Sequence, residues 1–304
     1  MDLLSDVVAV MRSGRPSSAR VAWHAPWGQR FPSVPGSAGF QVILRGSCWL
    51  IPPTGDPVAV GAGDVLFFPH GHGYGLADSP SRELAACDPI EDDDQFVTDF
   101  IGHEGPVTVT LCGGFRLTPG RAHPLLRDLP DVLHLPARLG HHTQLRAAVN
   151  LLGDEIRSPH TGADTVVLAL LDVLLVYILR AWFAGRPVQP KTGWAAALSD
   201  PALSDALLAL HRDPSHPWTV KSLADQAGLS RAAFAHRFTT LIGQPPLTYL
   251  TWWRLTLAAR LLRDGDAPLS EIAAQVGYAS GFSFANAFKR AYGTAPGRYR
   301  RHPA

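Results

Sequence analysis

Apolar and polar positions alternate over short distances in the first part of the chain and recur at helical spacing in the last part. Residues 21–117 are rich in Gly, Pro and short alternating runs, a pattern typical of an all-β sandwich or barrel. The runs Phe40–Leu44 and Cys48–Ile51, for example, flank a Gly-Ser turn. From Leu125 the apolar spacing becomes helical, and everything beyond about Ala195 is predicted to be helical.

Two domains are predicted from the chain length and from a break in the helical pattern. A chain of 304 residues exceeds the size at which one hydrophobic core normally stops growing. The pattern breaks in Gly185–Pro190, which contains two prolines, as an interdomain linker does. We therefore predict an α+β protein: a β-barrel with following helices at 1–185, a linker at 186–194 and an all-α domain at 195–304.

Charge is distributed unevenly between these parts. Residues 201–304 carry 12 Lys and Arg against 6 Asp and Glu, a net charge of +6, whereas residues 1–200 carry 15 against 20, a net charge of −5. This asymmetry fits a basic nucleic-acid-binding module joined to a domain of another kind, although many solvated surfaces are equally basic.

The apolar stretch Thr165–Phe183 is long enough to span a membrane, but Asp172 and Arg180 would be costly there. We predict no membrane contact and instead a buried or dimer-forming helix. Its apolar residues form two stripes, namely Leu168, Leu171, Leu175, Ile178 and Trp182, and Val167, Leu170, Leu174 and Tyr177. The stripes favour a core-facing helix and a homodimer contact about equally.

The compartment is predicted from the first residues and from the cysteines. The start of the chain, MDLLSDVVAVMR, carries acids where a signal peptide needs a basic segment. Three cysteines, an odd number, do not have the spacing of a disulfide framework. Both features indicate a cytoplasmic protein.

The C-terminal part contains one unit used twice. Apolar and small positions at Val220, Leu223, Ala224, Ala227 and Gly228 recur 49 residues later as Leu269, Ile272, Ala273, Val276 and Gly277. At an offset of 50, Ser230, Phe234, Phe238, Gly243, Pro246 and Tyr249 recur as Ser280, Phe284, Phe288, Gly293, Pro296 and Tyr299. Chance rarely matches so many positions in order, so the unit is a duplicated supersecondary element.

Each copy has the layout of a helix-turn-helix. In the first copy, Ala224 permits close helix contact, Gly228 accepts a left-handed turn, and Ser230 caps the second helix. Phe234 and Phe238, spaced i and i+4, hold that second helix to the core. Its remaining face is free to enter a major groove. One Ala-x-x-x-Gly match would be a weak signal, and two copies make it a strong one.

A predicted helix, Leu247–Leu262, joins the copies and would be about 24 Å long. Two recognition helices that read successive major grooves lie about 34 Å apart, and a linker helix plus two half-units has this order of size. The sequence therefore fits bipartite recognition of double-stranded DNA by one chain.

The segments SEIAAQVGY and FANAFKRAYGTAPGRYR, at 270–278 and 284–300, resemble the C-terminal signature of the AraC/XylS regulators. The resemblance covers about 195–304 and implies two helix-turn-helix subdomains that bind adjacent major grooves. It assigns the groove-facing positions to Arg231, Ala232, Ala235 and His236 in the first helix, and to Gly281, Phe282, Ala285 and Asn286 in the second. These regulators often carry Arg where His236 and Asn286 stand, so their base preference does not carry over there.

The chemistry of these side chains suggests how each would contact DNA. Asn286 can pair with adenine N6 and N7, and Phe282 can touch a thymine methyl group. The basic residues Lys289, Arg290, Arg298 and Arg300 would bind phosphates, which position the protein without reading the sequence. A solvated face is the alternative for the basic residues, and DNA contact is favoured for Lys289 and Arg290. The function expected is transcription regulation, with RNA polymerase as a partner if the protein is an activator.

Residues 1–135 resemble, more loosely, the cupin-type sensor domain found on some of these regulators, through the segments 25–31, 62–76 and 111–115. Relatives often carry His where Gln41 and Tyr74 stand. The resemblance implies a small-molecule effector, for which the aromatic residues could line a pocket: Trp27, Phe40, Trp49, Phe68 and Tyr74. Ordinary barrel core is the alternative interpretation of these five.

A metal is a second candidate ligand of the barrel. If residues 70–76 are extended, His70 and His72 project from one face, and Cys112 on a later strand could add a thiolate. Such a mixed set suits zinc or another divalent metal. A flexible polar loop explains the same histidines without a metal.

Two other classes of function remain as alternatives. Cupin barrels also host metal oxygenases and isomerases, but an incomplete ligand set disfavours an enzyme. A structural or partner-binding helical protein is disfavoured by the duplicated unit. The sequence has no nucleophile triad, P-loop or dinucleotide fingerprint, so we expect no enzymatic activity.

Overall fold

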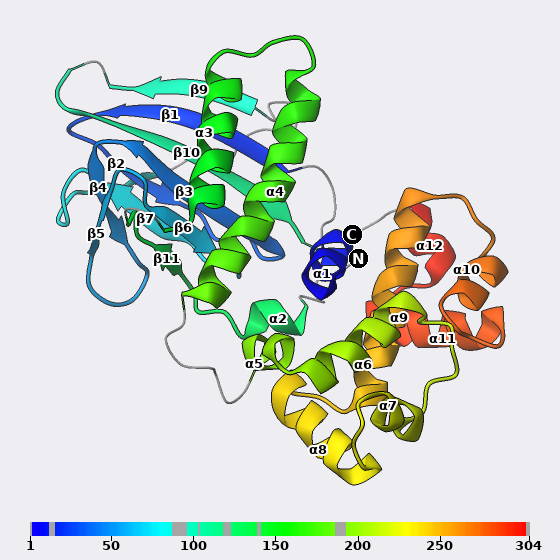
Figure 1. Cartoon of the computed structure of the whole chain (residues 1–304). Helices are drawn as coiled ribbons and strands as arrows, with labels where there is room; N and C mark the ends of the chain where they lie inside the picture. Colours follow the sequence, from blue (N-terminus) through cyan, green and yellow to red (C-terminus); the bar gives the residue numbers. More distant parts are fainter. Residues whose placement is uncertain are drawn as a thin grey trace. The chain divides into compact units, whose positions relative to one another are not determined.

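The computed structural model describes residues 2–11, 16–86, 96–102, 104–117, 123–138, 141–185 and 193–301 (Figure 1). The chain divides into two compact units. One, the sheet unit, comprises Arg12–Leu117 and Leu129–Gly185. The other, the helical unit, comprises Met1–Met11, Thr118–Asp128 and Arg186–Ala304. Most of the predicted linker, residues 186–192, lies outside the described residues.

The sheet unit contains two sheets that enclose a hydrophobic core. The six-stranded sheet has the order β11-β6-β3-β10-β1-β9, with β1 (Ser17–His24), β3 (Ser37–Arg45), β6 (Val65–Phe68), β9 (Phe96–Ile101), β10 (Val107–Arg116) and β11 (Leu133–Leu135). The five-stranded sheet has the order β5-β4-β7-β2-β8, with β2 (Gly28–Phe31), β4 (Ser47–Ile51), β5 (Val58–Gly61), β7 (Tyr74–Ala77) and β8 (Ala85–Ala86). The barrel-like fold predicted from the alternating pattern is confirmed.

Successive side chains of a strand point to opposite faces, so every second side chain points into the space between the two sheets. β1 runs antiparallel to β10, from the pair Ser17 and Gly114 to the pair His24 and Val107. The core draws on both sheets: Ile43, Leu66 and Phe68 come from the first, and Leu50, Val60 and Leu76 from the second. Burial of such side chains is the main stabilisation of this unit.

Two helices, α3 (Thr143–Arg157) and α4 (Ala163–Ala184), pack against each other and against the six-stranded sheet (Figure 1). α3 contacts β1 and β9, and α4 contacts β11. Within the described chain, α4 is the helix whose length and composition would allow it to cross a membrane. Its inner face is buried in the protein, so both predicted stripes contribute to the core, with Leu171, Leu174, Leu175 and Ile178 among them.

The helical unit consists of short helices around one long helix. Its elements are α1 (Leu3–Met11), α2 (Pro124–Arg127), α5 (Trp194–Ser199), α6 (Pro201–Arg212), α7 (Val220–Gln226), α8 (Arg231–Ile242), α9 (Pro246–Asp264), α10 (Leu269–Gln275), α11 (Gly281–Tyr292) and α12 (Pro296–Arg301). The predicted linker helix is α9, whose 19 residues span about 28 Å. α7 and α8 form the first helix-turn-helix, and α10 and α11 form the second.

Residues 1–11 and 118–128 form one compact unit with the C-terminal helices, although the sequence pattern assigned them to the N-terminal part. α1 contacts α6 and α9. The apolar residues of α1, among them Leu3, Leu4, Val7 and Val8, are buried. This amphipathic start is therefore part of the core of the helical unit.

Candidate nucleic-acid interface

The two candidate recognition helices, α8 and α11, begin in the same way. The backbone N–H of Ala233 donates to the hydroxyl of Ser230 at 3.2 Å, and the N–H of Ser283 donates to the hydroxyl of Ser280 at 3.1 Å. Each serine thus satisfies a backbone donor that the helix itself leaves unpaired. The predicted N-caps of both helices are confirmed.

The turns that precede these helices need a residue that accepts a positive φ. Gly228 has φ +65°, and Gly277 has φ +78°. Glycine adopts this left-handed conformation without the steric cost that a β-carbon adds. The turn predicted from the repeated glycine is confirmed in both copies.

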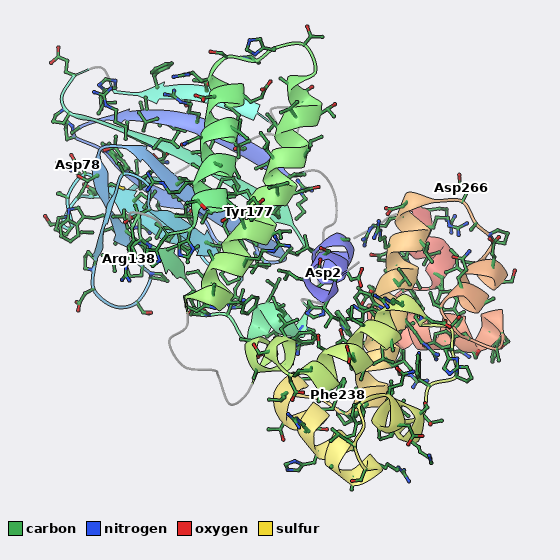
Figure 2. All side chains as sticks on the ribbon, viewed as in Figure 1. Asp2, Asp78, Arg138, Tyr177, Phe238 and Asp266 are labelled. Atoms are coloured by element: carbon green, nitrogen blue, oxygen red, sulfur yellow. The ribbon has the colours of Figure 1, made fainter. Side chains whose placement is uncertain are left out.

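Paired phenylalanines hold each helix by its inner face. Phe234 and Phe238 on α8 are fully buried with ring centroids 5.6 Å apart, and Phe284 and Phe288 on α11 are fully buried with centroids 5.7 Å apart. Figure 2 shows Phe238 on α8 among the other helices of this unit. The opposite face of each helix is left to solvent.

The side chains predicted to read bases lie on these outer faces. Arg231, Ala232 and His236 on α8, and Phe282 and Asn286 on α11, are exposed, whereas Ala235, Gly281 and Ala285 are half-buried. Phe282 is 79% exposed, the largest value among the exposed large hydrophobic side chains of the described chain. An exposed apolar ring at this position of the helix can contact a thymine methyl group.

The predicted phosphate-binding residues differ in their surroundings. Lys289, Arg290 and Arg298 are exposed and have no ion pair within the described residues. Arg300, in contrast, donates to the backbone carbonyls of Ala267, at 2.5 Å, and Asp266, which Figure 2 labels. Arg300 therefore holds the connection between α9 and α10, and its contact with a phosphate stays a prediction.

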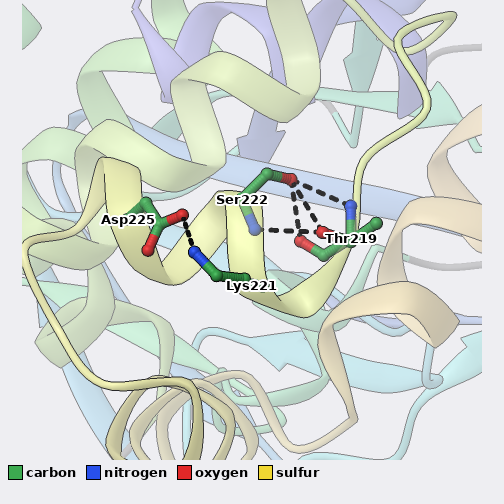
Figure 3. Close-up of polar contacts among 4 residues, drawn as sticks. All are labelled: Thr219, Lys221, Ser222 and Asp225. Carbon is green, nitrogen blue, oxygen red and sulfur yellow. Dashed lines mark hydrogen bonds and ion pairs between the residues drawn. The ribbon is translucent and has the colours of Figure 1, made fainter.

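The two copies differ at the start of their first helix. Thr219 and Ser222 form a reciprocal capping box at the start of α7, with the N–H of Ser222 donating to Thr219 Oγ1 at 3.0 Å and the N–H of Thr219 to Ser222 Oγ at 2.9 Å (Figure 3). Lys221 and Asp225 add an exposed pair at 2.7 Å. In the second copy, α10 begins after Pro268, which provides no side-chain cap.

A buried polar chain, which the sequence pattern did not indicate, crosses the helical unit. Leu125 N–H donates to His123 Nδ1 at 3.0 Å, which places the proton of His123 on Nε2, 3.4 Å from the Tyr249 hydroxyl. That hydroxyl then donates to His211 Nε2 at 2.7 Å. The remaining proton of His211, on Nδ1, faces the Asp6 carboxylate at 3.6 Å. The chain joins α1, α6 and α9.

Burial keeps both histidines of this chain neutral. It lowers the pKa of His123 well below its usual range, and the positive charge of Arg127, with that of His211 whenever His211 is protonated, lowers this pKa further. Burial also lowers the pKa of His211, against an opposing effect of the Asp6 carboxylate. The Tyr249 hydroxyl has a raised pKa because it is fully buried, so it stays protonated and can donate.

The five aromatic residues of the predicted effector pocket are not gathered in one place. Trp27 and Phe68 belong to the core between the sheets, and Tyr74 stacks on Phe68 with ring centroids 3.7 Å apart. Phe40 lies on the opposite face of β3, where it packs against Phe115. Trp49 alternates with Cys48 and Leu50, which face the core, and so points away from it. Stacked core explains the inward-facing members.

The predicted metal ligands are not brought together as a set of three, although the rings of His70 and His72 lie 5.6 Å apart between their centroids. His70 and His72 precede β7 and lie in irregular backbone at Gly71, which has φ +63°, so they do not share a strand face. His70 Nε2 contacts the Leu129 carbonyl at 3.0 Å, and His72 lies 3.3 Å from Asp131. Cys112 on β10 donates to the Ala19 carbonyl at 3.5 Å. Among the residues that the structure describes, no three His, Cys, Asp or Glu side chains are grouped to hold a metal.

A pocket of about 180 Å³ lies in another part of the sheet unit, among α3, β11 and the turn before β6. Its walls include the apolar side chains of Ile43, Leu145 and Val149. Arg138, which Figure 2 labels, and Arg146 also line it and are exposed. The pocket therefore combines an apolar wall with positive charge.

Comparison with known families matches both units. A family model described as Cupin matches residues 2–184, and a helix-turn-helix domain model matches residues 223–302. An AraC-like transcription regulator of Streptomyces lividans is 35% identical over 308 residues, which cover 100% of this chain and 99% of the relative. The HTH-type transcriptional regulator AlkR of Acinetobacter baylyi is 32% identical over 278 residues, 86% of each chain.

A solved structure of similar sequence contains DNA. It is the DNA-binding domain of AdpA in complex with a target DNA, which is 33% identical to this chain and has a TM-score of 0.32. The match covers 34% of this chain and 91% of that one.

Proposed function

Because the chain belongs to the AraC-like family of DNA-binding transcription regulators, we propose that α8 and α11 read base edges in two successive major grooves of one operator. The observation that carries this proposal is the repeated geometry of the two helices. Each is capped by serine, held by two buried phenylalanines and exposed on the opposite face.

Within this proposal, readout and positioning belong to different side chains of α11. Asn286 lies on the exposed face in the middle of the helix and has both the donor and the acceptor that adenine requires. Lys289 lies in the last turn, is exposed and carries only donors. We assign base recognition to Asn286 and phosphate contact to Lys289. His236 is the equivalent of Asn286 on α8.

The experiment that tests the proposal combines a binding selection with salt titrations. Asn286→Ala should weaken binding to the selected site by about 1–3 kcal/mol and relax the base preference at one position. Lys289→Ala should weaken binding to all sequences alike and reduce the slope of log affinity against log salt by about one. Asp264→Ala, which removes an exposed side chain from α9, serves as a control that should leave base preference unchanged.

The opposite outcome would contradict the proposed orientation of α11 in the groove. If Asn286→Ala leaves the selected site unchanged while Lys289→Ala shifts its base preference, the exposed face is inserted differently. If neither variant changes DNA affinity, α11 does not contact DNA.

We propose further that a small molecule controls this activity through the sheet unit. The match of residues 2–184 to the cupin model and the pocket beside α3 support this role. A relative in Escherichia coli, 30% identical over 281 residues, is named a transcriptional activator, RclR. By analogy, we propose that this chain activates transcription through contact with RNA polymerase. It would act in the cytoplasm by binding and not by catalysis.

A homodimer is proposed through the outer faces of α3 and α4. Leu151 on α3 and Val166 and Val173 on α4 are exposed apolar side chains on neighbouring helices. Tyr177, half-buried on α4, is labelled in Figure 2. A second copy of this chain would cover these side chains and raise the effective concentration of the DNA-binding units at paired sites.

A further inference from the structure

The two helix-turn-helix subdomains are joined through α9, and each packs on a different half of it. At its start, Tyr249 contacts Phe238 of α8 with ring centroids 5.9 Å apart, and Trp253 stacks on His211 of α6 at 3.7 Å. Towards its end, Leu255, Ala258, Ala259 and Leu262 belong to the core of the second subdomain. A single helix is a connection that can bend and twist, because long helices curve readily. A contact away from its axis would remove that freedom.

Arg254, near the middle of α9, makes such a contact. Its Nε donates to the carbonyl of Pro214 at 2.6 Å, and its Nη2 donates to the carbonyl of His216 at 2.9 Å. Both carbonyls belong to the loop between α6 and α7 in the first subdomain. The Asp213 carboxylate accepts a hydrogen bond from the backbone N–H of His216 at 3.0 Å, which holds this loop in shape.

The second subdomain contacts Arg254 and the same loop through Gly277, in the turn between α10 and α11. A β-carbon at Gly277 would lie 2.7 Å from Arg254 Nη2 and 2.9 Å from the Pro214 carbonyl. The turn therefore lies directly against both the guanidinium group and the loop of the first subdomain. At Gly228, the equivalent turn of the first copy, a β-carbon would meet nothing within 4 Å. The two glycines share a left-handed φ but only Gly277 has this second role.

We propose that Arg254 is a positioning residue that fixes the spacing and twist between α8 and α11 and so sets the number of base pairs between the two half-sites. This proposal rests on the bipartite reading proposed above. Each added base pair moves the second half-site by about 3.4 Å and turns it by about 35° around the DNA axis. A rigid pair of recognition helices binds tightly at one half-site spacing. A loosely joined pair binds several spacings with similar affinity.

The test measures affinity against half-site spacing with the full chain. A set of duplexes carries both selected half-sites with the spacer changed by up to two base pairs in either direction, and one further duplex has the second half-site scrambled. For the natural chain, a change of one base pair should weaken binding by about tenfold or more. For Arg254→Met the same change should cost about threefold or less, while affinity for the scrambled duplex stays within about twofold. Arg254→Lys, which keeps one donor group, should give an intermediate profile.

Matched glycine variants separate the contact from backbone strain. Gly277→Ala keeps Arg254 but places a methyl group against its guanidinium, so it should broaden the spacing profile in the same way as Arg254→Met. Gly228→Ala introduces a comparable positive-φ strain in open space and should keep the natural profile. Arg260→Met removes a positive charge from α9 outside the contact and should also keep it.

Each remaining outcome overturns the proposal. If Arg254→Met weakens binding by the same factor at every spacing, Arg254 acts as a phosphate ligand or as a fold-stabilising residue. If Gly228→Ala broadens the profile as much as Gly277→Ala, turn strain and not the Arg254 contact is responsible. If the natural chain binds the scrambled duplex as tightly as the complete one, the bipartite function itself fails, and this result is distinct from the first two.

Discussion

The buried histidines of the helical unit predict a stability that falls in mildly acidic solution. Burial lowers the pKa of both His123 and His211 in the folded chain, whereas both return to about 6.5 on unfolding. The unfolded chain therefore binds more protons than the folded chain below this pH. Stability is fully present above about pH 6.5 and decreases as the pH falls through that value.

The size of this loss of stability follows from the direction of the pKa shift and from the burial of each histidine. A group that is neutral in the folded chain and titrates at about 6.5 when unfolded costs about 1.4 kcal/mol of stability between pH 7.5 and 5.5. His123 is fully buried and lies near the positive charge of Arg127, so the whole amount applies to it. His211 contributes less because the carboxylate of Asp6 opposes the shift of its pKa.

The variant that isolates this effect is His123→Asn. Asparagine can still accept the hydrogen bond from the N–H of Leu125 but cannot be protonated. Urea unfolding of the full chain, followed by far-UV circular dichroism at pH 7.5 and 5.5, should show that the variant loses about 1.4 kcal/mol less than the natural chain on acidification. His236→Asn changes an exposed histidine and should retain the natural pH dependence. Equal losses in the natural chain and in His123→Asn would refute the reasoning.

Two further predictions concern the assembly and the minimal DNA-binding fragment. Val173→Glu places a charge on the exposed face of α4 and should convert the homodimer into a folded monomer, as sedimentation can measure. Leu175→Glu places a charge at a buried position and should instead unfold the sheet unit. If Val173→Glu leaves the mass in sedimentation unchanged, this face is not the dimer interface. A fragment from Gly193 onward should bind duplex DNA with an affinity that falls steeply with salt. The fragment lacks Asp6, which faces His211, and His123, which faces Tyr249. Its free energy of unfolding, measured in urea, should therefore be lower by about 1–3 kcal/mol for each of these lost partners. A fragment with flat salt dependence would contradict its role in phosphate binding.

The sequence predicts those features that depend on local chemistry. The repeat predicts left-handed turns at Gly228 and Gly277 and helix N-caps at Ser230 and Ser280, because each property belongs to one residue type at one position of a turn. The alternating runs predicted the strands of the barrel for a similar reason. Alternation alone does not say which face meets the core, so it does not distinguish Phe40, which packs on Phe115, from Phe68, which faces the core between the sheets.

Features that depend on contacts between distant segments were not predictable in this way. Residues 1–11 show only a short amphipathic pattern, which indicates that one face is buried but not by what. His123 lies 88 positions along the chain from His211, and no periodicity connects them. Arg254 gave a weak signal as one basic residue in a mostly apolar stretch, YLTWWRLTLA. Its partners are backbone carbonyls, which leave no signature in a sequence.

The two copies of the helix-turn-helix have the same internal structure but different contacts with the rest of the helical unit. The positions that repeat are those that form each helix-turn-helix from within: the small Ala, the turn Gly, the cap Ser and the two Phe. The copies diverge where each meets its surroundings. α7 has a capping box where α10 has Pro268, and Gly277 packs on Arg254 where Gly228 meets open space. His236 and Asn286 occupy equivalent positions in the repeat, so we expect them to occupy equivalent positions in two grooves. The base that each one reads depends on the chemistry of its own side chain.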